Sequence, residues 1–405
     1  MGMGSILIHS GRVITETGLI PDGYVLAEGG TISSVGPAAE KPERADTVIN
    51  AGGKYISPGF VDIHTHGIHD VDFMESDEET MERGLAAYAR FGVTRLLATT
   101  LSNPVDAIVK QIKRIRRVKT ESSLGGMLAG VHVEGPWLAE RCRGGHAAEY
   151  LRIPEENDIR LILGDIGDVI KTVTYAPELR NTSWFTEQLA RNGIVPVFGH
   201  TEASYDDAER CIQKGARHVT HMYDTTLGYG ENPDEALVMM PGMETSVMMN
   251  DEVSIELIGC PIHVPPPFFK FVNKVKPRHK RVVVTDSLAG AGLEDGTEFR
   301  YKDGHRIYVQ DGVLRMIDDD PKVNGNLTGS AVTMNTAISR VARFAGLPVE
   351  EAVRWGSINP AVTVGIEHET GSLQSGKAAD ITVFDDEFTV FLTVVRGNVV
   401  YDGGE

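Results

Sequence analysis

Short apolar segments alternate with longer amphipathic segments between residues 56 and 366. Eight of the apolar segments have the length of a buried strand, and helical periodicity lies between several of them. Eight strands alternating with helices over about 300 residues predict an α/β fold, a (β/α)8 TIM-like barrel, with an open doubly wound sheet as the alternative. The predicted strands are Gly59–Ile63, Thr94–Ala98, Leu128–Val133, Thr172–Tyr175, Pro196–Phe198, His218–Thr220, Ser254–Leu257 and Arg281–Val284, and the predicted helices include Glu78–Phe91, Pro104–Val118, Tyr205–Lys214 and Met334–Ala345.

The two ends of the chain have a different pattern, in which short strand-like segments are separated by Gly and Asp. Terminal segments of like character often form one structural unit. We therefore expect residues 1–56 and 367–405 to pair in a small flanking β-sandwich, beside a barrel formed by residues 57–366. The clearest terminal strands are Ile6–Ile8, Gly23–Leu26, Thr31–Val35, Asp380–Phe384 and Val390–Val395.

Charge and composition restrict the partners of the protein. The formal net charge is −18 at pH 7, from 39 basic and 57 acidic residues, so neither nucleic acid nor a membrane surface is an expected partner. The first residues contain no basic stretch followed by an apolar run, so a secretory signal is not expected, and no apolar run is long enough for an expected membrane span. Three widely spaced cysteines, Cys142, Cys211 and Cys260, fit free thiols in a reducing compartment. We therefore expect a cytoplasmic protein.

A His-x-His pair directly follows the first predicted barrel strand, Gly59–Ile63. At the end of a strand, residues two apart point to the same face, so His64 and His66 can converge on one metal ion above the barrel mouth. Taken alone the motif is weak, because a single histidine is more often a polar or core residue than a metal ligand.

The same placement recurs at the ends of four other predicted strands. Each ends in a His, Glu or Asp at its C-terminal end, which is where the active sites of such barrels lie. This mixture of nitrogen and oxygen donors suits Zn²⁺, Fe²⁺, Mn²⁺ or Co²⁺ rather than Ca²⁺. We expect one or two divalent ions, with zinc favoured. The residues are Glu134 after the third strand, His200 after the fifth, His221 after the sixth and Asp286 after the eighth.

Three further roles follow from these positions. A bound divalent ion lowers the pKa of water from ~16 to ~7 and so provides hydroxide near neutral pH. Asp286 is the expected acid/base that moves the proton, and its alternative role is that of a plain ligand. His263, just beyond the seventh strand, could stabilise an oxyanion, and His146 lies on a glycine-rich loop that could touch the substrate. The alternative for both is a histidine of a surface loop.

At these residues the chain resembles the amidohydrolase superfamily, and more closely its N-acetylglucosamine-6-phosphate deacetylase family. The resemblance implies a barrel with a flanking β-sandwich, a homodimer, and hydrolysis of the N-acetyl amide of a small amino sugar. The segments that carry it are Pro58–Gly67, His132–Pro136, Gly144–His146, Glu149–Tyr150, Gly199–Thr201, Thr220–His221, Thr285–Asp286, Gly325–Ala331, Asn359–Ala361 and Gly376–Asp380.

The resemblance also implies a role for individual residues. The principal metal would be held by Glu134, His200 and His221, and a second ion by His64 and His66. Asp286 would be the catalytic acid/base. The remaining implied roles concern the substrate: His146 and His263 would contact the sugar and its acetyl carbonyl, and residues around Leu327 and Thr328 would line the substrate pocket.

Two departures from the family pattern concern the phosphate. Asp224-Thr225 follows the sixth strand where the family has Asn-Ala, whose backbone and side chain help to hold the sugar phosphate. No arginine occurs in Leu227–Met243, where the family commonly supplies one from the partner subunit. An aspartate near a phosphate costs on the order of a kcal/mol in a partly buried site. We keep Asp224 and Thr225 as candidate substrate contacts.

The predicted reaction is metal-dependent deacetylation of an N-acetylated amino sugar, with N-acetylglucosamine-6-phosphate favoured. Metal-bound hydroxide would attack the acetyl group and Asp286 would protonate the leaving amine. Alternative substrates are N-acetylgalactosamine-6-phosphate, an unphosphorylated sugar or an N-acyl amino acid. A cyclic-imide hydrolase is disfavoured because the strand Thr172–Tyr175 has no lysine at its end. A non-catalytic barrel scaffold is the remote alternative, because every expected ligand is present.

Overall fold

All eight predicted barrel strands are present in the structure, a computed structural model that describes residues 4–231, 235, 237–300 and 306–404. They pair in parallel in the order β17-β16-β13-β12-β11-β10-β9-β6, which confirms the predicted barrel. The strands are β6 (Phe60–Thr65), β9 (Val93–Thr100), β10 (Leu128–Glu134), β11 (Ile170–Tyr175), β12 (Val195–Phe198), β13 (His218–Val219), β16 (Ser254–Ile258) and β17 (Arg281–Val284).

The two ends of this sheet meet just beyond β17. The backbone N–H of Asp286 donates to the carbonyl oxygen of His64 at 2.9 Å, and that of His66 donates to the carbonyl of Ser287 at 2.8 Å. These bonds nearly close the barrel. They also place the His-x-His motif and Asp286, which are more than 200 residues apart in sequence, side by side at the same seam.

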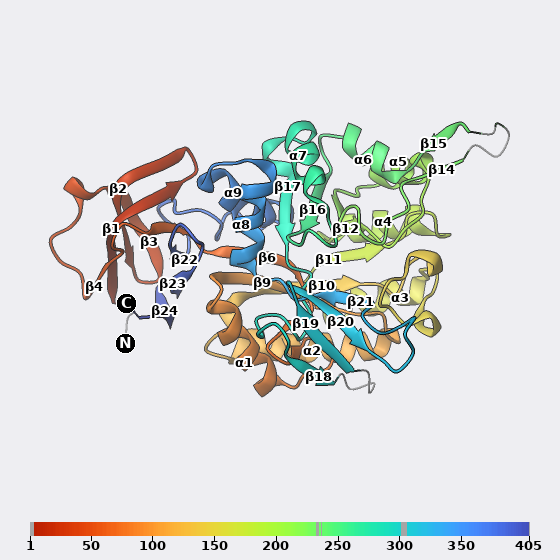
Figure 1. The fold of residues 1–405 in the computed structure, drawn as a ribbon, viewed down its shortest axis with the longest axis horizontal. Helices are drawn as coiled ribbons and strands as arrows, with labels where there is room; N and C mark the ends of the chain where they lie inside the picture. The colour runs from red at the N-terminus through yellow and green to blue at the C-terminus, as the bar shows by residue number, and fades with distance from the viewer. Residues whose placement is uncertain (1–3, 232–234, 236, 301–305, 405) are drawn as a thin grey trace.

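Helices surround the barrel, one after each strand in the chain (Figure 1). The predicted helical segments are confirmed as α1, α2, α5 and α8. In α2 the periodic apolar residues Ile108, Ile112 and Ile115 are buried in the core that the helix shares with the strands. The helices are α1 (Glu78–Ala89), α2 (Val105–Glu121), α3 (Glu156–Ile162), α4 (Thr182–Arg191), α5 (Tyr205–Ile212), α6 (Met243–Met249), α7 (Pro266–Val275), α8 (Met334–Ala345), α9 (Val349–Trp355) and α10 (Ile358–Thr363).

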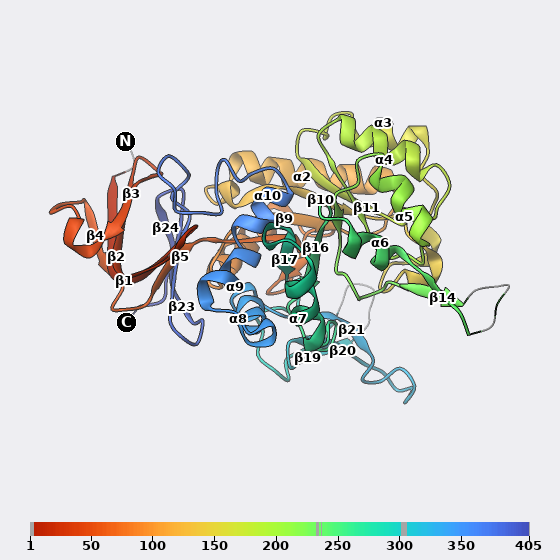
Figure 2. The same ribbon diagram turned by 90° about the horizontal axis from the view of Figure 1, so that it is seen from above.

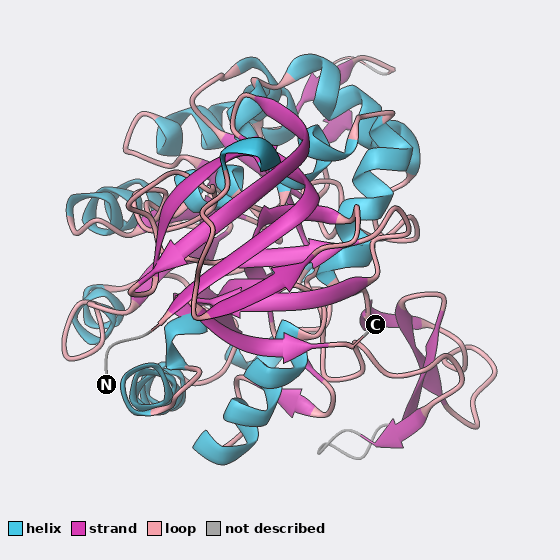
Figure 3. Cartoon of the chain, turned by 90° about the vertical axis from the view of Figure 1, so that its left-hand side faces the viewer, coloured by secondary structure: helices cyan, strands magenta, loops and turns pink. Residues whose placement is uncertain are grey.

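Both chain ends join one mixed sheet of eight strands at one end of the molecule, facing the viewer in Figure 3. The junction is β5, which pairs parallel with β1 and antiparallel with β22. Ile8, Val25 and Ile381 share its apolar core. The domain boundaries near residues 56 and 366 stay a prediction. The strands are β1 (Ser5–Thr15), β2 (Gly18–Glu28), β3 (Thr31–Pro37), β4 (Thr47–Asn50), β5 (Tyr55–Pro58), β22 (Ile381–Phe384), β23 (Val390–Val395) and β24 (Asn398–Asp402).

A four-stranded antiparallel sheet between β17 and α8 was not predicted (Figure 2). Its strands are short, and the apolar alternation in them is weak. The last of them ends at the barrel mouth, where the Ser330 hydroxyl donates to the Thr285 carbonyl at 2.7 Å. The strands are β18 (Glu298–Arg300), β19 (Arg306–Gln310), β20 (Val313–Ile317) and β21 (Leu327–Ser330), and two small hairpins pair β7 (Gly67–Ile68) with β8 (Val71–Asp72) and β14 (Tyr229–Glu231) with β15 (Met239–Pro241).

The search for membrane spans gave no candidate. Among the described residues, no helix combines the length and the apolar character that a membrane-spanning segment needs.

Candidate metal centre

The interior of the barrel is polar, whereas its outer surface is apolar. On β6, Val61 and Ile63 pack outward in a cluster that includes Ala361 of α10. The alternate residues, Asp62 and His64, are fully buried and lie inside the barrel, because successive side chains of a strand point to opposite faces. The same alternation brings polar side chains from β10, β13 and β16 toward the barrel axis. These residues are His132, Glu134, His218, Ser254 and Glu256, each at most 3% exposed.

The first group of potential metal donors consists of Glu134, His200 and His221, which follow or end three different strands. Glu134 Oε1 lies 3.2 Å from His200 Nε2 and 3.1 Å from His221 Nε2. The two imidazole nitrogens are 3.1 Å apart. All three side chains are buried. The three donor atoms therefore surround one point.

The second group consists of His64, His66 and Asp286. Asp286 Oδ1 lies 3.2 Å from His64 Nε2 and 3.3 Å from His66 Nε2, and the two nitrogens are 3.3 Å apart. Glu134 joins this group to the first, since its Oε1 is 3.4 Å from His64 Nε2 and its Oε2 is 3.2 Å from His66 Nε2. Two donor groups thus share one carboxylate.

The spacing and charge of these groups fit a divalent cation. Bonds of 2.0–2.1 Å in a tetrahedral site separate neighbouring donors by about 3.3 Å, which agrees with the separations in both groups. Within the described residues, the ion pairs of Glu134 and Asp286 involve only histidines. Two carboxylates in a buried site without Lys or Arg need positive charge, which protonated histidines or a bound metal ion that displaces their protons would supply.

The backbone adopts the left-handed conformation at three of the donor residues. His200, His221 and Asp286 have φ values of 50°, 21° and 46°. Such conformations cost a non-glycine residue about 1–3 kcal/mol each and cluster at functional sites. All three residues follow directly on a barrel strand or its continuation, and the turn of the backbone accompanies the inward direction of each side chain.

Mutual attraction between rings and carboxylates shifts their pKa values. Burial opposes ionisation of Asp286, but the neighbouring His64, His66 and His221 lower its pKa below the ordinary value. Burial likewise opposes protonation of His66, but Asp286 and Glu134 raise its pKa. The same balance of burial against Glu134 and Asp286 raises the pKa of His221. The carboxylates are therefore held in the charged form that binds cations.

The rings of several donors are fixed through their second nitrogen. Nδ1 of His64 lies 2.6 Å from Glu256 Oε1, and Nδ1 of His200 lies 2.8 Å from the carbonyl oxygen of Cys142. A hydrogen on Nδ1 leaves the Nε2 lone pair free toward the donor group, and such outer contacts orient metal ligands in proteins. These two imidazoles are thus pre-arranged as Nε2 donors.

His146 lies in the donor site itself, which contradicts its interpretation as a histidine of a surface loop. It is 3% exposed, and its Nε2 lies 3.3 Å from Glu134 Oε2. The backbone N–H of Ser102 donates to His146 Nδ1 at 3.2 Å, so the ring hydrogen is on Nε2. His146 therefore presents an N–H group at the site.

The other predicted contacts lie outside the two donor groups. His263 follows β16 and is 8% exposed, so a surface-loop position is wrong for it as well. Burial lowers its pKa, but Cys260 and, to a smaller extent, Asp224 and Asp286 produce a net rise. Thr225 lies over the loop of His146, since a Cβ on Gly144 would be 3.0 Å from its methyl group. Leu327 is 41% exposed on β21 at the mouth, and Thr328 follows it.

Sequence reasoning missed Glu256 and His218, two buried polar residues beneath the donors. A signal existed for Glu256, which is the one charged residue in the predicted strand Ser254–Leu257. No comparable signal marked His218, because a histidine at the start of an apolar strand is common.

Comparison with known proteins places the chain in a family. The amidohydrolase family profile matches residues 55–400. The chain is 28% identical over 400 residues to the N-acetylglucosamine-6-phosphate deacetylase of Bacillus subtilis, with 98% of this chain and 97% of that protein covered. It is 31% identical over 374 residues to the mouse (Mus musculus) protein of the same name, with 90% and 88% covered. The crystal structure of the Pasteurella multocida deacetylase, 28% identical, matches with a TM-score of 0.86 over 98% of this chain and 99% of that one. The chain therefore belongs to the amidohydrolase family.

Proposed function

We propose that the protein is a metal-dependent amidohydrolase that removes the acetyl group from an N-acetylated amino sugar. The favoured substrate is N-acetylglucosamine-6-phosphate, and the products are acetate and the free amine. The proposal rests on the two donor groups. Glu134 joins them, and Asp286 belongs to the second group. The similarity to deacetylases along nearly the whole chain supports the substrate class.

Glu134, His200 and His221 would hold the principal ion, and His64 and His66, with Asp286, a second one. A divalent ion there polarises an amide carbonyl and lowers the pKa of a water molecule. The three donors of the first group are almost inaccessible, whereas the Asp286 side chain is 19% exposed. The first group is therefore the better enclosed one.

The acid/base role belongs to Asp286 in this proposal. Its carboxylate is ionised and partly accessible from the mouth, so it can take a proton from the attacking water and pass it to the departing nitrogen. His263, on the adjacent strand end, would donate a hydrogen bond to the acetyl oxygen as negative charge develops there. The Nε2–H of His146 would bind a sugar hydroxyl.

Recognition of the 6-phosphate would distinguish the favoured substrate from its unphosphorylated alternatives. Asp224 and Thr225 follow the sixth barrel strand, and Leu327 and Thr328 border the mouth. In the segment 227–243 no arginine is available, and residues 232–234 and 236 of it lie outside the described residues. N-acetylgalactosamine-6-phosphate, an unphosphorylated N-acetylhexosamine and an N-acyl amino acid are the alternatives.

Acetate release from a panel of N-acetylated compounds tests the proposal. With zinc or cobalt added, we expect turnover of N-acetylglucosamine-6-phosphate with kcat/KM about tenfold or more above that of the unphosphorylated sugar, because a charge-assisted contact contributes roughly 1.5–3 kcal/mol. The 4-epimer and an N-acetyl amino acid complete the panel. Absence of turnover across the panel by metal-loaded protein contradicts the deacetylase assignment, and equal rates with both sugars contradict phosphate recognition.

A homodimer is also proposed, with the β14–β15 hairpin as part of the contact. This hairpin projects from the barrel, far from the sheet of the chain ends (Figure 1). Leu237 is 95% exposed and Met239 69% exposed, and clustered apolar side chains at such a projection are typical of interaction sites.

The double substitution of Leu237 and Met239 by Asp is expected to convert a dimer into a monomer, because charges in an apolar contact lose hydration without gaining a partner. Light scattering after gel filtration measures this. Val399→Asp, at an apolar position on β24 that is 41% exposed, is the control and should leave the mass unchanged. A dimeric double variant contradicts the proposed contact.

A further inference from the structure

Glu256 is a buried carboxylate with no place in the proposed chemistry. It lies on β16 beneath both donor groups and is 1% exposed. An isolated buried carboxylate is strongly unfavourable unless hydrogen-bond donors surround it. The structure supplies such hydrogen-bond donors from β6 and from β13 with the residues that follow it.

Three donors converge on Glu256 Oε1. The Nδ1 atom of His64 is 2.6 Å away, the Thr220 hydroxyl 2.6 Å and the backbone N–H of His221 3.0 Å. Because an ionised carboxylate only accepts hydrogen bonds, the hydrogen of His64 is on Nδ1. Oε1 therefore contacts one residue of each donor group, the His64 side chain and the His221 main chain.

The other oxygen of Glu256 is held from below. His218 Nε2 lies 3.0 Å from Oε2, and His218 Nδ1 lies 2.9 Å from the Ser254 hydroxyl. A continuous chain of hydrogen bonds thus connects His64 to Ser254 at the opposite end of the barrel. It restricts Glu256 at both oxygens.

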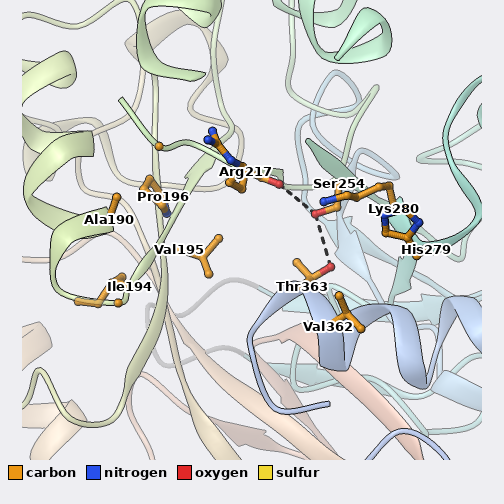
Figure 4. A pocket seen from close by; sticks show the side chains of 12 residues that line it. Ala190, Ile194, Val195, Pro196, Arg217, Ser254, His279, Lys280, Val362 and Thr363 are labelled. Atoms are coloured by element: carbon orange, nitrogen blue, oxygen red, sulfur yellow. Dashed lines mark hydrogen bonds between the residues drawn. The ribbon is translucent and has the colours of Figure 1, made fainter. Parts of the chain in front are cut away.

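This series of hydrogen bonds ends at Ser254, which lines a pocket below the barrel strands (Figure 4). There the one hydrogen of the Ser254 hydroxyl points to the Arg217 carbonyl at 3.1 Å, and the Ser254 oxygen accepts from Thr363 at 3.4 Å. Arg217 and Lys280 line the pocket, but their side chains donate to backbone carbonyls, as in Lys280 Nζ to Glu252 at 2.8 Å. The series of hydrogen bonds therefore ends at this pocket, and we assign no ligand to the pocket.

We propose that Glu256 is a positioning residue for the second metal ion, and this role rests on the metal centre of the proposed function. By accepting the Nδ1 hydrogen of His64, it fixes the tautomer and the ring angle that direct Nε2 toward His66 and Asp286. His218 holds Glu256 in place. The principal group depends on Glu256 only through the main chain of His221, so its loss affects the two groups unequally.

Stepwise binding of Co²⁺ to metal-free protein tests the proposal. In Glu256→Gln, an amide of the same shape presents an N–H₂ group or a weaker acceptor to the His64 hydrogen. Loss of such an outer contact costs 10- to 100-fold in metal affinity, roughly, so the Kd of the second equivalent should rise by that factor. The Kd of the first equivalent should change by about threefold at most. The visible absorption of the Co²⁺ ion that binds as the second equivalent should shift, because its bond to His64 Nε2 changes.

Three further variants isolate the effect. Asp380→Asn changes another buried carboxylate, which pairs with Arg95 at 2.9 Å far from the donors, and should leave both Kd values unchanged. In a His64→Asn background, which loses the second equivalent, Glu256→Gln should change the Kd of the remaining first equivalent by about threefold at most, because Glu256 contacts the first group only through the main chain of His221. His218→Gln should weaken the second equivalent in the same direction as Glu256→Gln.

The outcomes distinguish the positioning role of Glu256 from the proposed deacetylation. An unchanged second Kd in Glu256→Gln, or equal weakening of both equivalents, overturns the positioning role. A larger weakening of the first equivalent by Glu256→Gln in the His64→Asn background overturns it as well. If the wild-type protein binds a single equivalent of Co²⁺, there is no second site, and the positioning role of Glu256 is overturned with it. Protein that binds two equivalents normally and releases no acetate contradicts the substrate proposal and leaves Glu256 in its role.

Discussion

Asp286→Asn is expected to lower kcat by about 10³-fold, within the range that a positioned acid/base contributes. Asparagine keeps the shape of the side chain but can neither accept the proton of water nor give one to the amine. His64→Asn is expected to lower kcat less, by about tenfold, because the principal donors Glu134, His200 and His221 and the acid/base remain. Steady-state kinetics and metal analysis of the same preparations measure both effects.

The order of the two effects is the decisive result. Asp286 also belongs to the second donor group, at 3.2 Å from His64 Nε2, so its variant can lose the second ion as well. The His64 variant serves as the control for that loss. A greater loss of activity in His64→Asn than in Asp286→Asn would show that the principal site is misassigned.

Glu134→Gln is expected to remove most of the bound metal and nearly all of the activity. Glu134 approaches the Nε2 atoms of both groups, at 3.1–3.4 Å from those of His64, His66, His200 and His221. Removing one member of a buried charged cluster costs roughly 3–5 kcal/mol, which corresponds to about 10²–10⁴-fold in metal affinity. Atomic absorption after gel filtration should show loss at both sites, unlike the loss of one equivalent in His64→Asn.

Thermal unfolding provides a second readout for Glu134. A ligand that binds only the folded state raises the Tm, so zinc should stabilise the wild-type protein and have little effect on Glu134→Gln. Asp158→Asn is the control. Asp158 is a buried carboxylate that accepts a hydrogen bond from Trp137 Nε1 at 3.0 Å and contacts no residue of either metal-donor group. It should keep its metal and its response to zinc. Full metal content in Glu134→Gln contradicts the shared-ligand assignment.

The sequence determined the barrel because the evidence for each strand is local. A segment such as Leu128–Val133 is apolar except for His132, and the residue that follows it, Glu134, stands at a strand end whatever its neighbours are. Parallel strands end on the same side of a barrel, so the strand-end positions alone predicted that His64, Glu134 and Asp286 would lie together. The weak alternation in 298–330 explains why β18–β21 escaped prediction.

The family resemblance already implied how the histidines and Glu134 divide between two ions, and only the tertiary structure decided what holds the donors and that Asp286 joins His64 and His66. The Glu256 contact to His64 joins residues 192 positions apart, and that of His146 to Ser102 joins a loop to a different strand end. A period of two predicts which face of a strand a side chain occupies, and it contains no information on its partner across the barrel. That partner depends on strand order, register and ring rotation, which arise when the whole chain packs. The sequence thus placed the ligands at one rim, and the packed barrel arranged them in two groups above Glu256.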